Sequence, residues 1–211
     1  MSDRRSAVMR IGIDFDNTLV DYDCVFLGAA KERGLVDAAF CGSKRAVRDA
    51  IRSLPDGELA WQRLQGYVYG AGIGDAIMFN GVDLFLRDCR ARGVDVFVVS
   101  HKTQFGHYDP MGVDLRQAAL DWMARHGFFC SDGFGISVEQ VFFESTRSGK
   151  LARIRAIGCT HFIDDLEEVF TDPNFPAQTF PILFAATGSL RVGAVCPSWQ
   201  RIAEVLFDGR R

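Results

Sequence analysis

Two aspartates one residue apart end a short apolar segment near the start of the chain, Ile11-Gly12-Ile13-Asp14-Phe15-Asp16. The apolar residues of this segment predict a buried strand. Two carboxylates at the end of a buried strand repel each other, and this repulsion costs several kcal/mol unless a cation compensates it. Because hard divalent cations bind oxygen ligands, the pair predicts a Mg²⁺ site in which one carboxylate is able to act as a nucleophile.

The elements that must position these carboxylates follow from the apolar pattern. Beyond residues 10–15, further strands are predicted over 94–100, 140–144, 161–164 and 181–184. Helical patterns over 82–92, 115–126 and 150–157 lie between them, and each ends at a glycine, a common helix stop. This alternation predicts an α/β fold, a Rossmann-like three-layer αβα parallel sheet whose ligands bind at the carboxyl ends of the strands.

The first four predicted strands each end in, or shortly before, polar residues. In one parallel sheet these ends converge on a single crevice. A set of metal ligands, a hydroxyl group and a lysine is what phosphoryl transfer requires. The residues are Asp14 and Asp16 after the first strand, Ser100 at the second, Lys150 shortly after the third, and Asp164 and Asp165 at the fourth.

One stretch interrupts the alternation of strands and helices. Residues 21–77 carry helical patterns over 22–33, 44–54 and 58–69, and no convincing strand. The stretch directly follows the first pair of aspartates. We therefore predict a small all-α cap over residues 21–77, inserted into a core domain made of residues 1–20 and 78–211.

Composition narrows the classes of function. The chain has 211 residues, a net charge of −3 and a pI of about 5.8, so nothing indicates a nucleic-acid partner or a membrane surface. No segment is long and apolar enough to span a bilayer. The six cysteines are scattered without a CxxC pair, which argues against a zinc site or a disulfide framework and favours reduced thiols in a cytoplasmic protein.

With these motifs in order, the chain resembles the haloacid dehalogenase (HAD) superfamily, and is most similar to its Mg²⁺-dependent phosphatases with a small helical cap. The family's first motif, D-x-D-x-T-L/V after an apolar strand, is matched by Asp14-Phe15-Asp16-Asn17-Thr18-Leu19. Ser100 matches the second motif, Lys150 the third, and the acidic pair Asp164-Asp165 the fourth. The four motifs occur in the family's order and span most of the chain.

The resemblance implies a role for each aspartate. Asp14 would attack phosphorus and become an aspartyl phosphate. Asp16 would protonate the leaving alcohol and then activate the water that hydrolyses the intermediate. Mg²⁺ would be bound by the Asp14 carboxylate, the Asp16 backbone carbonyl and Asp164, with Asp165 assisting.

The resemblance also implies how the phosphate is held. Ser100 and Lys150 would bind the transferring phosphoryl oxygens, and backbone N–H groups near Phe15 would face the phosphate. The substrate would be a small phosphorylated metabolite, enclosed by the cap. Its identity, and whether the protein is a monomer or a homodimer, do not follow from the sequence.

Several of these residues have other interpretations. Arg147 and Lys102 compete with Lys150 for the third motif. Asp165 could also be the N-cap of a helix, because Glu168 follows it at the spacing of a capping box, and it could serve the metal site as well. Ser100 could be a turn or N-cap serine.

Other activities are also open. A phosphotransferase or phosphomutase would use the same motifs. A dehalogenase-type hydrolase would use Asp14 alone, although the acidic Asp16 argues against it. A catalytically silent binding module would be expected to lose one of the acidic residues, and all of them are present here.

Overall fold

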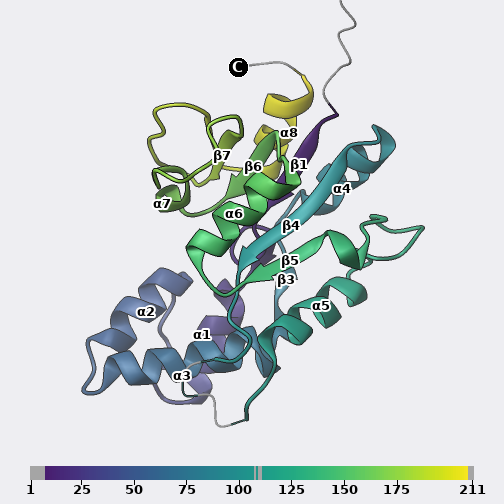
Figure 1. Cartoon of the computed structure of the whole chain (residues 1–211). Helices are drawn as coiled ribbons and strands as arrows, with labels where there is room; N and C mark the ends of the chain where they lie inside the picture. Colours follow the sequence, from purple (N-terminus) through teal and green to yellow (C-terminus); the bar gives the residue numbers. More distant parts are fainter. Residues whose placement is uncertain (1–7, 107, 109–110, 209–211) are drawn as a thin grey trace, which may run out of the picture. The chain divides into compact units, whose positions relative to one another are not determined.

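The chain divides into two compact units in a computed structural model, which describes residues 8–106, 108 and 111–208 (Figure 1). Unit 1 comprises Met1–Leu19, Phe79–His101 and Phe128–Arg211. Unit 2 comprises Val20–Met78 and Lys102–Gly127.

Unit 1 is built on a six-stranded sheet in the order β5-β4-β1-β6-β7-β8, and all of these neighbours pair in parallel. Figure 1 shows β1 between β4 and β6. The predicted parallel α/β sheet is confirmed, and the five predicted strands end within two residues of their predicted limits. The strands are β1 (Arg10–Ile13), β4 (Asp95–His101), β5 (Val141–Glu144), β6 (His161–Asp164), β7 (Phe180–Phe184) and β8 (Ala194–Cys196).

Helices flank this sheet. On α6, the side chains of Leu151 and Ile154 pack in one buried cluster with Val99 of β4 and Phe162 of β6. The helices of unit 1 are α4 (Val82–Ala91), α6 (Arg147–Ile157), α7 (Glu167–Phe170) and α8 (Trp199–Phe207), with a 3₁₀ turn η2 (Val138–Gln140). Helix α6 begins at Arg147 rather than at residue 150, because the Thr146 hydroxyl caps it by accepting from the Gly149 N–H at 3.0 Å.

Unit 2 is mainly helical. It contains α1 (Asp23–Glu32), α2 (Lys44–Arg52), α3 (Gly57–Tyr69), η1 (Ala71–Asp75) and α5 (Leu115–Arg125). Two short strands, β2 (Val20–Asp21) and β3 (Ile77–Met78), pair antiparallel where the segment 20–78 begins and ends. These strands were not predicted, since two residues are too few to give a periodic pattern.

The segments that make up unit 2 extend beyond the predicted cap over residues 21–77, because residues 102–127 also belong to this unit. Helix α5 forms where it was expected, but it packs within unit 2, where the Trp122 indole donates to the Ala76 carbonyl at 2.9 Å. An amphipathic pattern predicts that a helix has a buried face without identifying what covers it. The sequence therefore placed α5 correctly along the chain and did not identify its packing partner.

None of the six cysteines is in a disulfide, and Cys89, Cys159 and Cys196 are buried. Burial raises the pKa of the Cys159 thiol to about 11, as expected for an unreactive core residue.

Within the described ranges, no helix combines the length and the apolar character that crossing a membrane requires.

Gly12, in the centre of β1, provides a test of the sheet packing. A Cβ atom at this position would lie 2.6 Å from Cδ2 of Phe162 and 2.9 Å from the Cys159 sulfur. We expect Gly12→Ala to lower the free energy of unfolding by about 1–3 kcal/mol because of this overpacking. Urea denaturation measures the change. Gly28→Ala in α1, where a Cβ meets nothing within 4 Å, serves as the control and should be neutral or slightly stabilising. Equal effects of the two substitutions would contradict the packing.

His161, at the start of β6, makes the stability depend on pH. Burial lowers the pKa of its imidazole, so the unfolded chain binds the proton more readily than the folded protein does. The contribution of His161 is therefore complete above its ordinary pKa and is lost as the pH falls toward the lower pKa of the folded state. We expect the free energy of unfolding to fall between pH 7.5 and about pH 5.5, and to fall less in His161→Gln. If the free energy of unfolding falls equally with pH in the wild-type protein and in His161→Gln, then His161 is not the cause.

Candidate active site

The centre of the site is Asp14, which directly follows β1. Its backbone N–H donates to the Ile163 carbonyl of β6 at 2.9 Å, which extends the sheet pairing by one residue. The residue is 5% exposed. Its neighbour Phe15 is fully buried and contacts Phe143 of β5 edge to face, with the ring centroids 6.1 Å apart. The strand and the aromatic contact thus fix the backbone on both sides of the carboxylate.

Lys150 connects Asp14 to the end of β6. Its Nζ lies 2.5 Å from Oδ1 of Asp14 and 2.6 Å from Oδ2 of Asp164. The three side chains are at most 7% exposed. Both contacts are charge-assisted hydrogen bonds in a nearly water-free environment, where ionic interactions are strongest.

The surroundings shift the pKa values of Lys150 and Asp164. Burial by itself lowers the pKa of Lys150, but the carboxylates of Asp14 and Asp164 outweigh it and raise the pKa above its ordinary value. Burial raises the pKa of Asp164, and Lys150 offsets only part of this effect. Lys150 is therefore a cation at neutral pH, and Asp164 needs positive charge nearby to stay ionised.

The two aspartates at the end of β6 have different partners. Oδ1 of Asp164 accepts the Leu166 N–H at 3.0 Å, whereas Oδ1 of Asp165 accepts the Thr18 hydroxyl at 3.3 Å. The N-cap of α7 is Leu166, with no side-chain cap bond, so the interpretation of Asp165 as an N-cap is wrong. It fails because Asp164, not Asp165, accepts the N–H of the turn.

Thr18 is a part of the site to which the sequence analysis assigned no role. It is fully buried, and its carbonyl accepts the indole N–H of Trp199 at 3.2 Å. Its hydroxyl in turn contacts Asp165. The signal that could have found it is its place in the D-x-D-x-T pattern, because a buried hydroxyl needs a hydrogen-bond partner.

Three carboxylates of the site are close enough to share a metal ion. Asp14, Asp164 and Asp165 each offer one oxygen atom, and these atoms all lie within 4.8 Å of one another. An all-oxygen set of this kind fits a hard divalent cation such as Mg²⁺. Asp16 is partly exposed and follows two residues later. Its predicted role in catalysis and its predicted carbonyl ligand stay predictions.

The structure also places the residues predicted to hold phosphate. Ser100 lies near the end of β4, is 1% exposed and pairs in register with Phe143 of β5. Of the three cationic candidates, Lys150 contacts the carboxylates, whereas Arg147 pairs with Glu168 on the surface at 2.8 Å and Lys102 belongs to unit 2. The phosphate contacts of Ser100, Lys150 and the Phe15 backbone stay predictions.

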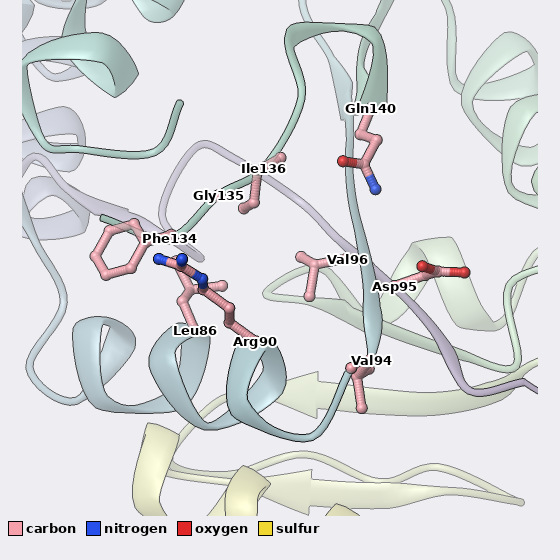
Figure 2. Close-up of a pocket in the computed structure, with 10 residues that line it drawn as sticks. Leu86, Arg90, Val94, Asp95, Val96, Phe134, Gly135, Ile136 and Gln140 are labelled. Carbon is pink, nitrogen blue, oxygen red and sulfur yellow. The ribbon is translucent and has the colours of Figure 1, made fainter. Parts of the chain in front are cut away.

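A cavity of about 240 Å³ lies elsewhere in unit 1, at the amino end of β4. Figure 2 shows Arg90 of α4 beside Phe134, with Gly135 and Ile136 on the adjoining loop. The Arg90 guanidinium donates to the carbonyls of Gly133, at 2.7 Å, and Ser131. These bonds attach the loop to α4, so we interpret Arg90 as structural; the acidic residues lie at the opposite, carboxyl ends of the strands.

Solved structures, rather than family models or curated proteins, show which known fold this chain has. No model of a known protein family matches the chain, and no curated protein matches it. Solved structures do match. Protein Tyrosine Kinase A from Mycobacterium tuberculosis aligns over 96% of this chain and 99% of its own, with a TM-score of 0.62 and 15% identity. A haloacid dehalogenase-like hydrolase from Streptococcus pneumoniae covers the same shares, with a TM-score of 0.60 and 14% identity.

A third match is a HAD family hydrolase from Deinococcus radiodurans, solved with bound phosphate and sodium. It aligns over 96% of both chains, with a TM-score of 0.58 and 15% identity. At a sequence identity of 14–15%, these structural matches show that the fold is shared. The chain has the fold of the haloacid dehalogenase superfamily hydrolases, and the resemblance drawn from the motifs is confirmed for the fold.

Replacing Lys150 tests the buried ion group. Lys150→Met keeps the length of the side chain but leaves Asp14 and Asp164 facing each other without a cation. We expect a loss of about 3–5 kcal/mol in the free energy of unfolding at pH 7, measured by urea denaturation in the presence of EDTA.

Arg147→Met on the same helix is the matched control. Its ion pair with Glu168 is exposed, with side chains 44% and 59% accessible, so its loss should cost less than about 1 kcal/mol. If Lys150→Met destabilises the protein no more than Arg147→Met does, then the buried contacts do not hold the site together.

Proposed function

We propose that this protein is a Mg²⁺-dependent phosphomonoester hydrolase that acts on a small phosphorylated metabolite in the cytoplasm. The observation that carries the proposal is the buried contact of Lys150 with Asp14 and Asp164. This contact brings together Asp14, the proposed nucleophile, the Lys150 cation and Asp164, a proposed metal ligand, at the carboxyl ends of β1 and β6. Asp165 adds a third oxygen ligand within 4.8 Å of the other two.

Asp14 acts as the nucleophile. Its carboxylate oxygen forms a bond to phosphorus while the bond between phosphorus and the substrate's alcohol oxygen breaks, which yields an aspartyl phosphate. Asp16, two residues further on, gives its proton to the departing alcohol. It then takes a proton from water, whose oxygen attacks phosphorus and releases inorganic phosphate and free Asp14.

The remaining residues orient the reacting groups and neutralise negative charge. Lys150 orients Asp14 and supplies positive charge to the transferring phosphoryl oxygens, together with the Ser100 hydroxyl. The Leu166 N–H and the Thr18 hydroxyl hold Asp164 and Asp165 in place. Asp14, Asp164 and Asp165 would hold Mg²⁺, which would supply positive charge to neutralise the phosphoryl group.

The comparisons support this assignment from the fold. The Deinococcus radiodurans protein was solved with phosphate and sodium, so an anion and a cation bind to a chain of the same architecture. Two of the three similar structures named above are described as hydrolases. The acidic residue at position 16 favours transfer of a phosphoryl group over displacement of a halide, because departure of an alcohol requires a proton donor and departure of a halide does not.

The direct test is hydrolysis of p-nitrophenyl phosphate. We expect turnover with MgCl₂, loss of turnover in EDTA, and a decrease in kcat of at least about a thousand-fold for Asp14→Asn, which removes the nucleophile but keeps the shape. Asp16→Asn should reduce kcat strongly while Mg²⁺ binding, followed by calorimetry, is largely retained.

Asp132→Asn is the matched control, since Asp132 is exposed in a loop of unit 1 and should retain wild-type kcat. Turnover that survives both EDTA and Asp14→Asn would refute the mechanism. Release of inorganic phosphate, measured beside p-nitrophenol, separates a hydrolase from a phosphotransferase: the two products appear in equal amounts only if water is the acceptor.

A further inference from the structure

Another cavity of unit 1, with a volume of about 740 Å³, is lined by α7, by the chain that follows this helix, and by the β7–β8 loop, residues 185–193. Its volume is within the range of pockets that bind small molecules. None of the residues proposed above for catalysis, phosphate binding or metal binding lines it. The cavity is therefore separate from the candidate active site.

The β7–β8 loop takes the place of a crossover helix. Parallel strands such as β7 and β8 are usually joined through a helix, but this loop contains none. A Cβ atom at Gly188 would lie 2.5 Å from the Leu183 side chain of β7, and one at Gly193 would overlap the Pro181 carbonyl group. Residues 189–192, between the two glycines, line the cavity. The loop is thus held close to β7 at both glycines, and its middle part forms a wall of the cavity.

Two phenylalanines form an apolar wall of the same cavity. Phe170 of α7 and Phe175 contact each other edge to face, with the ring centroids 5.3 Å apart. Both rings also pack against the buried cluster that contains Phe162 of β6. Because the protein core already holds these rings in place, a ligand would not have to order them.

The loop adds two aliphatic side chains that solvent reaches. Leu190 is partly buried and Val192 is 70% exposed, and both line the cavity. A single exposed valine is common on protein surfaces, but this one lies in one cavity with the two phenylalanines. An apolar ligand in the cavity would remove these side chains from water, which favours binding.

Arg191 lies in the chain between these two aliphatic residues, and it also lines the cavity. It is exposed, and within the described part of the chain its guanidinium group has no hydrogen bond or ion pair. The Thr179 hydroxyl, another polar group of the lining, already donates to the Cys159 carbonyl at 2.8 Å. A guanidinium group can bind a carboxylate through two parallel hydrogen bonds, so Arg191 is suited to an anionic group next to an apolar one.

Glu167 is the carboxylate that faces the cavity, and it would repel an anion placed beside it. This residue has a structural explanation, since it lies in the first turn of α7, where a negative charge is favoured by the free N–H groups of the helix. Arg191 has no such partner in the fold. We therefore assign the polar end of the ligand to Arg191.

We propose that this cavity binds a small molecule with an apolar body and one carboxylate group. The carboxylate pairs with Arg191, and the apolar body lies against the two phenylalanines and the aliphatic side chains of the β7–β8 loop. The proposal does not rest on the phosphatase function, because it involves none of the proposed catalytic residues.

The test uses three probes with the same chain length and different charge: octanoate, 1-octanol and octylammonium. Each is titrated into the full-length protein at pH 7 in EDTA, without substrate, and followed by the amide NMR shifts of Leu190 and Val192. We expect the dissociation constant of octanoate to be at least about tenfold lower than that of 1-octanol, because only octanoate forms charge-assisted hydrogen bonds with Arg191. Octylammonium should bind most weakly.

Two substitutions at exposed positions separate the charged contact from the apolar one. Arg191→Met should raise the dissociation constant of octanoate at least about tenfold and leave that of 1-octanol unchanged. Val192→Ser should weaken the binding of both probes, because it removes apolar contact. Arg201→Met is the matched control, since Arg201 pairs with Glu204 on α8 at 2.9 Å, outside the cavity, and it should leave both constants unchanged.

The proposal is overturned if octanoate binds no more tightly than 1-octanol, if Arg191→Met matches Arg201→Met, or if no probe shifts the loop amides at millimolar concentration. Strongest binding by octylammonium that is lost in Glu167→Gln would also overturn it, because the ligand would then be a cation. If octanoate binds as expected to a protein that does not hydrolyse p-nitrophenyl phosphate, the carboxylate site stands and the proposed phosphatase function fails.

Discussion

The candidate site depends on one buried ammonium group between two buried carboxylates. Without Lys150, the ends of β1 and β6 would bring Asp14 and Asp164 together in a region that excludes water. Their repulsion would then oppose the pairing of the two central strands. The same cation therefore stabilises the sheet and orients the proposed nucleophile, so stability and chemistry cannot be separated at this position.

Helix α6 illustrates why burial, rather than charge alone, distinguishes the site. Arg147, Lys150 and Arg153 all form ion pairs from this helix. Arg147 and Arg153 are about 40% exposed, so solvent screens their pairs and each contributes little. Lys150 points from the same helix into the protein, where its desolvation must be compensated by both carboxylates. A buried ion group of this kind is costly for stability alone, which supports a functional reason for it.

The sequence predicted those features that depend on local chemistry. The strand ending in Asp14 and Asp16, the acidic pair at 164 and 165, and most helices were recognisable because each lies in one continuous segment. Features that depend on contacts between distant segments were missed or misread. Nothing local indicates that Thr18 faces Asp165 or that α5 packs within unit 2. The bond from the Leu166 N–H to Asp164 spans only two residues, and it was misread because either of two adjacent aspartates can accept such a bond.

Charge balance explains why the group is suited to a divalent cation. The site sets three carboxyl groups, those of Asp14, Asp164 and Asp165, against the one ammonium group of Lys150. Burial raises the pKa of Asp164, and the neighbouring Asp14 carboxylate adds to the effect, because both disfavour the charged form of the carboxyl group. In the proposed mechanism, a divalent cation would add positive charge to these carboxyl groups without a proton. The phosphate ester would then approach a less negative group, and this would allow two negatively charged partners, the ester and Asp14, to react with each other.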